Sequence, residues 1–144
     1  MVRIASVLVI GYALLGCLNP VAAGGLEASK SLLCQTDEGR EYHTGGKIKP
    51  FNPESVGLAK KFVVDFKQGI VRPTADSYVN RRSRIQKIAY VENKIILLGA
   101  EDGIEGVDDG IGWTAAISRD TGRFTVSAAG QGVGYIVFGV CTAE

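Results

Sequence analysis

Two cysteines stand near opposite ends of the chain that follows an N-terminal export signal, and they constrain the fold more than any other feature. A bridge between Cys34 and Cys141 would close a loop on the order of 100 residues, which stabilises a fold by about 4–5 kcal/mol in the chain-entropy model. The chain has no CxxC motif and no Cys/His spacing typical of a metal site. We therefore expect a structural disulfide between Cys34 and Cys141; the alternative is two buried free thiols.

Residues 1–23 have the three parts of a signal peptide. Arg3 supplies a positive start, residues 4–18 are apolar and uncharged, and Val21-Ala22-Ala23 offers the small residues that a signal peptidase needs. The apolar part is shorter than the roughly 20 residues of a comfortable membrane span. We expect cleavage before Gly24 and a periplasmic or secreted protein of bacterial origin, with an uncleaved anchor helix as one alternative.

The third cysteine, Cys17, lies inside this signal. Leu14-Leu15-Gly16-Cys17 resembles a lipobox, although Leu15 is bulkier than the usual residue before the glycine. A membrane-anchored lipoprotein attached through Cys17 is therefore the alternative localisation. In both cases an even pair of cysteines remains in an oxidising compartment, where disulfides persist.

Removal of the signal leaves residues 24–144, enough for a single domain with a real core. Without Arg3, the basic and acidic residues are equal in number, and a neutral domain is not built for nucleic-acid binding. Basic residues outnumber acidic ones in residues 24–94, and acidic residues outnumber basic ones in residues 95–144. The sequence also has no second apolar run long enough to span a membrane.

Short alternating segments predict a mainly β fold. The expected strands are 61–66, 85–91, 94–98, 113–118, 123–128 and 135–141. Glu92-Asn93 is a two-residue hairpin candidate in which Asn93 can take a positive φ, and Gly122 ends a polar turn. Strands at this spacing indicate a compact antiparallel barrel or sandwich of about 6–8 short strands. We also expect core positions for the alternating residues Trp113, Phe124, Tyr135 and Phe138.

The earlier part of the domain is less regular. Asn52-Pro53 is a good helix start, and it predicts one short helix of one or two turns that ends by Lys60. Residues 74–84 fit either a short helix or an irregular strand, and residues 24–30 are expected to form a loose leader.

Several of these segments occur in a familiar order. They are Phe62–Phe66, Ile88–Tyr90, Trp113–Ile117, Asp120–Phe124 and Gly139–Cys141. Their pattern resembles small exported proteobacterial β-domain proteins of unknown function, which carry a cysteine near the mature N-terminus, an R-x-TG strand turn and a C-terminal G-x-C. The resemblance spans roughly residues 34–141. It implies a compact, disulfide-closed β domain and carries over no catalytic residue.

The segment from Glu101 to Trp113, EDGIEGVDDGIGW, has unusual chemistry. Closely spaced carboxylates on a glycine-rich loop suit a hard cation such as Ca²⁺, and the candidate ligands are Asp102, Glu105, Asp108 and Asp109. Their spacing does not match an EF-hand loop. The alternative is a solvated connection between two strands, in which Asp and Gly serve turn geometry alone.

A basic cluster precedes the predicted strand 85–91. Arg81, Arg82, Arg84 and Lys87 could dock an anionic partner such as a lipid head group, a glycan or an acidic protein surface. The alternative is a solvated face that balances the acidic loop.

The sequence contains no G-x-S-x-G motif, and its one histidine, His43, stands beside acidic residues that favour a surface ion pair. We therefore expect a non-enzymatic exported β domain without a cofactor, which binds an envelope protein, a glycan or a small apolar ligand held in a barrel. The alternative is a cation-dependent factor or an enzyme that uses the acidic loop 101–109.

Overall fold

The computed structural model describes residues 26–103 and 110–144. The predicted signal with Cys17, and the acidic residues Glu105, Asp108 and Asp109, lie outside the described residues. The strands are β1 (Ser31–His43), β2 (Ile48–Phe51), β3 (Lys61–Asp65), β4 (Ile70–Pro73), β5 (Ser83–Val91), β6 (Lys94–Glu101), β7 (Ile111–Ser118), β8 (Arg123–Gly130) and β9 (Val133–Ala143). Among the described residues, no helix is long and apolar enough to cross a membrane.

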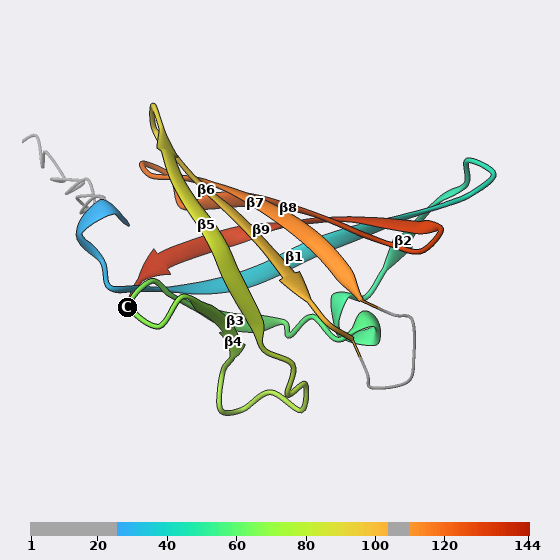
Figure 1. The fold of residues 1–144 in the computed structure, drawn as a ribbon, viewed down its shortest axis with the longest axis horizontal. Coiled ribbons are helices and arrows are strands. Elements are labelled where there is room, and N and C mark those ends of the chain that lie inside the picture. Colours follow the sequence, from blue (N-terminus) through green and yellow to red (C-terminus); the bar gives the residue numbers. More distant parts are fainter. Residues whose placement is uncertain (1–25, 104–109) are drawn as a thin grey trace, which may run out of the picture.

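Eight of these strands form a closed antiparallel barrel. The order runs β1, β3, β4 and onward to β9, and β9 then pairs with β1 along almost its whole length, from Leu32 opposite Ala143 to His43 opposite Val133. Figure 1 shows these two long strands side by side. This pairing decides between the two predicted architectures, because a sandwich would leave the sheet unclosed.

The ninth strand, β2, lies outside the closed ring. The first half of β1 pairs with β3, and its second half pairs with β2 on the same edge. A bulge between Thr36 and Glu38 marks the change, and the Thr36 backbone N–H donates to the carbonyl of Lys60 over 2.9 Å. A bulge bends its strand locally. The chain between β2 and β3 is thereby set over one end of the barrel.

That connecting chain contains the predicted short helix as a single 3-10 turn, η2 (Pro53–Val56). The side chain of Asn52 accepts the Glu54 N–H over 3.1 Å, as an N-cap should. Gly57 ends the turn with φ at 83°, a left-handed conformation in which glycine carries no Cβ penalty. Of the one or two turns predicted, a single turn forms.

All six predicted strands are present, and five of them are longer than predicted. The hairpin between β5 and β6 is also present, but the positive φ of 50° belongs to Glu92 and not to Asn93. Gly122 has the expected left-handed backbone, with φ at 68°. Residues 74–82 form neither a helix nor a strand, and β5 begins only at Ser83.

The predicted loose leader is partly structured. Leu26–Ala28 form a 3-10 turn, η1, and Leu26 is buried in the main core cluster together with Leu32. Figure 1 shows η1 near the end of the barrel at which β1 begins and β9 ends. We call this the η1 end. The opposite end, formed by η2, Ser83, Glu101 and Ile111, is called the loop end.

Candidate functional site

The interior of the barrel contains a cavity of about 550 Å³. Aliphatic and aromatic side chains from most of the barrel strands form its wall, among them Phe62, Val64, Leu97, Ile117, Phe124 and Val137. Successive side chains of a strand point to opposite faces, and these buried residues occupy the inward positions. The eight-stranded barrel is therefore not filled by its own side chains and leaves space for one small molecule.

The disulfide lies in this wall. Cys34 of β1 and Cys141 of β9 are direct partners across the closing strand pair, and their sulfurs are bonded. Both residues are buried and line the cavity. The predicted bridge is confirmed, and it fastens the seam that closes the barrel.

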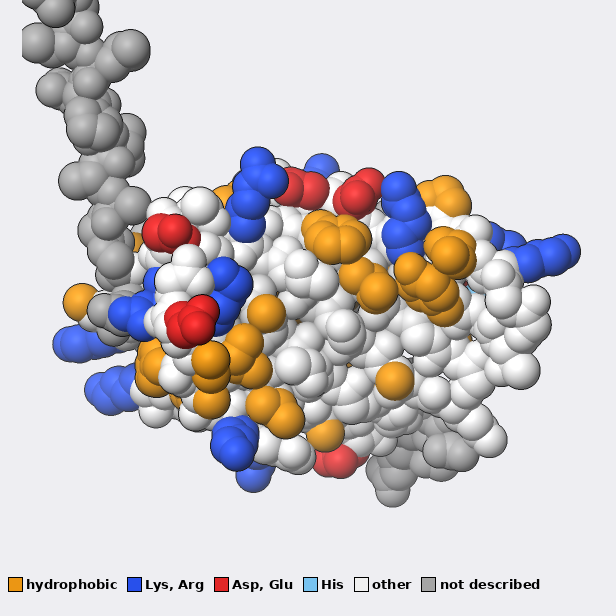
Figure 2. Space-filling model, turned by 90° about the horizontal axis from the view of Figure 1, so that it is seen from above, with side chains coloured by type: hydrophobic (Ala, Val, Ile, Leu, Met, Phe, Trp, Pro, Cys, Tyr) orange, Lys and Arg blue, Asp and Glu red, His pale blue; other side chains and the backbone are white. Residues whose placement is uncertain are grey.

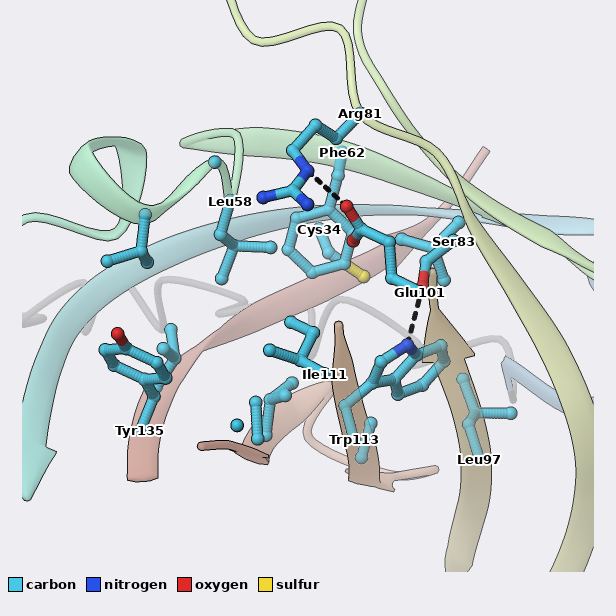
Figure 3. Close-up of a pocket in the computed structure, with 18 of the residues that line it drawn as sticks. Cys34, Leu58, Phe62, Arg81, Ser83, Leu97, Glu101, Ile111, Trp113 and Tyr135 are labelled. Carbon is cyan, nitrogen blue, oxygen red and sulfur yellow. Dashed lines mark hydrogen bonds and ion pairs between the residues drawn. The ribbon is translucent and has the colours of Figure 1, made fainter. Parts of the chain in front are cut away.

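Trp113 owes its place in the wall to a glycine. Residue 99 of β6 is the register partner of Trp113 on β7, and a Cβ on Gly99 would stand 2.1 Å from the indole ring. Glycine in a strand marks such a close approach. The indole Nε1–H donates to Ser83 Oγ over 2.6 Å, which satisfies the one polar atom of the ring (Figure 3).

Two further aromatic rings also lie against a glycine on a neighbouring strand. Phe124 lies across Gly139, and Phe51 lies across Gly39, where an added Cβ would meet the ring at 2.6 Å and 2.5 Å respectively. The ring of Phe51 also packs against Tyr135, with centroids 5.1 Å apart. Small residues and rings thus alternate across neighbouring strands, and this arrangement shapes the cavity wall.

Polar side chains line the cavity at the loop end. Among the described residues they are Ser55, Arg81, Ser83, Glu101 and Gln131, together with the hydroxyl of Tyr135. The Arg81 guanidinium forms an ion pair with the Glu101 carboxylate, and their side chains are 31% and 17% exposed. Figure 3 shows this pair on one side of the cavity, close to Ser83.

The backbone of η2 brings a further constraint to Arg81. A Cβ on Gly57 would stand 2.6 Å from the Cδ of Arg81, so the side chain of Arg81 passes directly over this glycine. Arg81 is thereby held between η2 and the end of β6. Among the described residues, the rim therefore carries one positive and one negative side chain, with an apolar interior beneath it.

The structure divides the predicted basic cluster. Arg81 turns to Glu101 at the cavity, whereas Arg82, Arg84 and Lys87 are exposed. Arg84 and Lys87 belong to β5, on either side of a bulge between Ile85 and Lys87. Arg81 therefore belongs to the cavity rim, and docking of an anionic partner by Arg82, Arg84 and Lys87 stays a prediction.

The predicted cation site receives no support from the described residues. Asp102 is exposed, and its proposed partners Glu105, Asp108 and Asp109 lie outside the described residues. In the parts of the chain that the structure describes, no group of three or more His, Cys, Asp or Glu side chains could hold a metal ion. Glu101, the first acid of the segment, is engaged with Arg81.

The outer surface of the barrel carries scattered apolar side chains. Phe138, expected in the core with Trp113 and Phe124, instead points outward from β9 and is 37% exposed, as is its neighbour Val140 at 38%. Figure 2 shows hydrophobic side chains on one face in small groups between charged residues. This is an ordinary pattern for a protein surface.

Sequence reasoning placed Trp113, Phe124 and Tyr135 in the core and did not separate a filled core from a cavity wall. The sequence pattern did not indicate the role of Ser83, and it did not indicate that Arg81 pairs with Glu101. The glycines at inward positions of otherwise apolar strands, such as Gly99, were the signal that could have located the wall.

Comparison of the chain with models of protein families, with curated proteins and with solved structures finds no match in any of the three. The class of protein is therefore defined by its own geometry: an eight-stranded antiparallel barrel, closed by a buried disulfide, with an apolar cavity and a polar rim.

Proposed function

We propose that this protein is an exported, non-enzymatic binding protein that holds a small apolar ligand inside its barrel. The observation that carries the proposal is the cavity of about 550 Å³, walled by aliphatic and aromatic side chains. Cavities that bind small molecules typically measure about 300–1,000 Å³ and are mostly apolar with a few placed polar groups. The size and the lining of this cavity both meet that description.

An apolar ligand fits the cavity better than a glycan does. A glycan presents hydroxyl groups along its whole length, and each of them would need a hydrogen-bond partner once it is removed from water. Beneath the rim, the wall offers side chains such as Phe62, Leu97 and Val137. Burial of an apolar ligand against this wall is favourable at roughly 25 cal/mol per Å².

An exported location accords with the remaining features. Residues 1–23 read as a signal peptide, and a disulfide such as Cys34–Cys141 persists in an oxidising compartment. We propose a periplasmic or secreted protein after cleavage before Gly24. Attachment through a lipidated Cys17 would place the same barrel at a membrane surface.

The test compares two substitutions on one strand. Ala128 of β8 lines the cavity, while its neighbour Ala129 is exposed on the outer face. Ala128→Phe should fill the space beside Trp113 and weaken binding of the fluorescent probe N-phenylnaphthylamine by about tenfold or more. Ala129→Phe adds the same ring outside the barrel and should leave binding unchanged. Equal effects of both substitutions, or no probe binding by the natural protein, would refute the proposal.

A further inference from the structure

The polar lining of the cavity is concentrated at one end. Arg81, Ser83 and Glu101 lie at the loop end, and the remaining wall includes apolar residues such as Phe124 and Val137. A ligand that fills this space therefore meets charged and hydrogen-bonding groups at one end only. Resting on the proposed function, we infer that the ligand is an amphiphile with a single, uncharged polar head that lies at the Arg81–Glu101 pair and an apolar tail that extends into the apolar interior of the barrel.

The Arg81–Glu101 pair contains one positive and one negative charge. The Arg81 guanidinium and the Glu101 carboxylate already form an ion pair, and both side chains are largely removed from solvent. A carboxylate head would approach the Glu101 carboxylate, and an ammonium head would approach the Arg81 guanidinium. Each would lose hydration on entering and meet a like charge beside its partner.

The pair also offers both kinds of hydrogen-bonding group. The guanidinium offers only donors, and the ionised carboxylate offers only acceptors. A hydroxyl group can accept from Arg81 and donate to Glu101 at the same time, and it leaves the ion pair intact. The ion pair is therefore complementary to a neutral group with one donor and one acceptor, such as an alcohol.

Neighbouring residues fix the position of the pair. Arg81 is confined by Gly57, which caps η2 and where an added Cβ would meet the Cδ of Arg81 at 2.6 Å. On the neighbouring wall, Ser83 Oγ accepts the indole N–H of Trp113 over 2.6 Å. The rim groups are thus held in place before a ligand arrives, which favours selection of one head-group chemistry.

The experiment compares dodecanol with dodecanoate at about pH 8, where the carboxylate of dodecanoate is ionised. Trp113 is the only tryptophan of the chain and lines the cavity, so its fluorescence reports binding, and calorimetry gives the affinity. The natural protein should bind dodecanol at least about tenfold more tightly than dodecanoate. Glu101→Gln removes the negative charge and should raise the affinity for dodecanoate about tenfold, with little change for dodecanol.

Asp102→Asn is the matched control, because it removes the same charge one residue further along at an exposed position. It should leave the preference unchanged. A reciprocal variant keeps the test decisive if Glu101→Gln does not fold: Arg81→Gln should raise the affinity for dodecylammonium and not that for dodecanoate.

The outcomes separate the two proposals. Binding of dodecanoate as tight as that of dodecanol, or an equal gain from Asp102→Asn, would overturn the neutral-head inference and leave the small-ligand function standing. If neither compound binds the natural protein and N-phenylnaphthylamine does, the ligand is not a simple amphiphile and only this inference fails. If none of the three binds, the proposed function fails as well.

Discussion

Trp113 lies directly across Gly99 on the neighbouring strand, and this contact leaves no room for a side chain at residue 99. A Cβ there would stand 2.1 Å from the indole ring and 2.5 Å from the carbonyl oxygen of Arg84. The ring can lie against the wall and reach Ser83 only because β6 has a glycine at this register position. One backbone position therefore controls the largest side chain of the cavity.

Gly99→Ala should displace the indole and destabilise the fold by about 1–3 kcal/mol, the usual cost of inserting an extra methyl group into a packed site. Urea unfolding measures the loss, and the emission of the single tryptophan reports the displacement. Gly112→Ala is the matched control, since residue 112 adjoins Trp113 and a Cβ there meets nothing within 4 Å. Equal stabilities of the two variants would show that Trp113 does not depend on Gly99.

The disulfide joins the first and last barrel strands at a buried position. Cys34 is 0% exposed and Cys141 is 3% exposed. Replacing both residues by alanine should lower the free energy of unfolding by about 2–5 kcal/mol, because the open chain regains conformational freedom when it unfolds. Urea unfolding followed by circular dichroism measures the change. The folded spectrum should keep its β signature, since the strand pairing of β1 with β9 does not depend on the sulfurs.

Burial of the sulfurs also predicts how the natural protein responds to a reductant. A thiolate must reach the disulfide to reduce it, and an ionised thiolate would lose its hydration on entering the apolar cavity that Cys34 and Cys141 line, so access controls the rate. Dithiothreitol should reduce the Cys34–Cys141 bond slowly under native conditions and rapidly in urea. Thiol labelling followed over time checks this, and rapid reduction of the folded protein would contradict the buried location.

The strands that could be predicted are those whose inward positions carry large apolar residues. β3, β6 and β9 present residues such as Phe62, Leu97 and Val137 at alternate positions, so period-two alternation is visible. β1 was not predicted because two of its inward positions lack a large apolar side chain. These positions are Thr36 before the bulge and Gly39 after it. Residue 39 is a glycine because the ring of Phe51 fills the space where a side chain would lie. This contact joins two strands, so the alternation within either strand does not reveal it.

The same distinction holds for the candidate site. The disulfide could be predicted, because only two cysteines follow the signal. The pairing of Arg81 with Glu101 could not, because it depends on how the chain before β5 and the end of β6 meet at one end of the barrel. A hollow interior depends on closure of the barrel through β1 and β9. Alternation of apolar residues predicts which face of a strand points inward. It does not predict whether that face packs against another side chain or borders a cavity.

Ser83 provides the hydrogen-bond acceptor for the indole of Trp113. Ser83→Ala should cost about 1–3 kcal/mol, because the partly buried N–H would lose its partner. The tryptophan emission should shift as the ring adjusts, and urea unfolding gives the stability. Ser127→Ala changes an exposed serine of β8 and serves as the control. A stability loss for Ser127→Ala that matched the loss for Ser83→Ala would remove the special role of the Trp113 contact.

The turn between β7 and β8 contains a carboxylate with a lowered pKa. A hydrogen bond from the Ser118 hydroxyl, followed by backbone N–H groups of the turn and by Asn93, holds the pKa of Asp120 below its ordinary value of 3.8. Because the folded pKa is lower than the unfolded one, the stabilisation is present above the unfolded pKa and is lost as the pH falls through the folded pKa.

Asp120→Asn should therefore lower stability at neutral pH, and its difference from the natural protein should shrink below about pH 4. Urea unfolding at a series of pH values measures that difference. Ser118→Ala removes the largest cause of the shift, so it should move the pKa of Asp120 back towards its ordinary value in a carboxyl NMR titration. A difference between Asp120→Asn and the natural protein that stayed constant down to the acid limit would show that the carboxylate charge does not stabilise this turn.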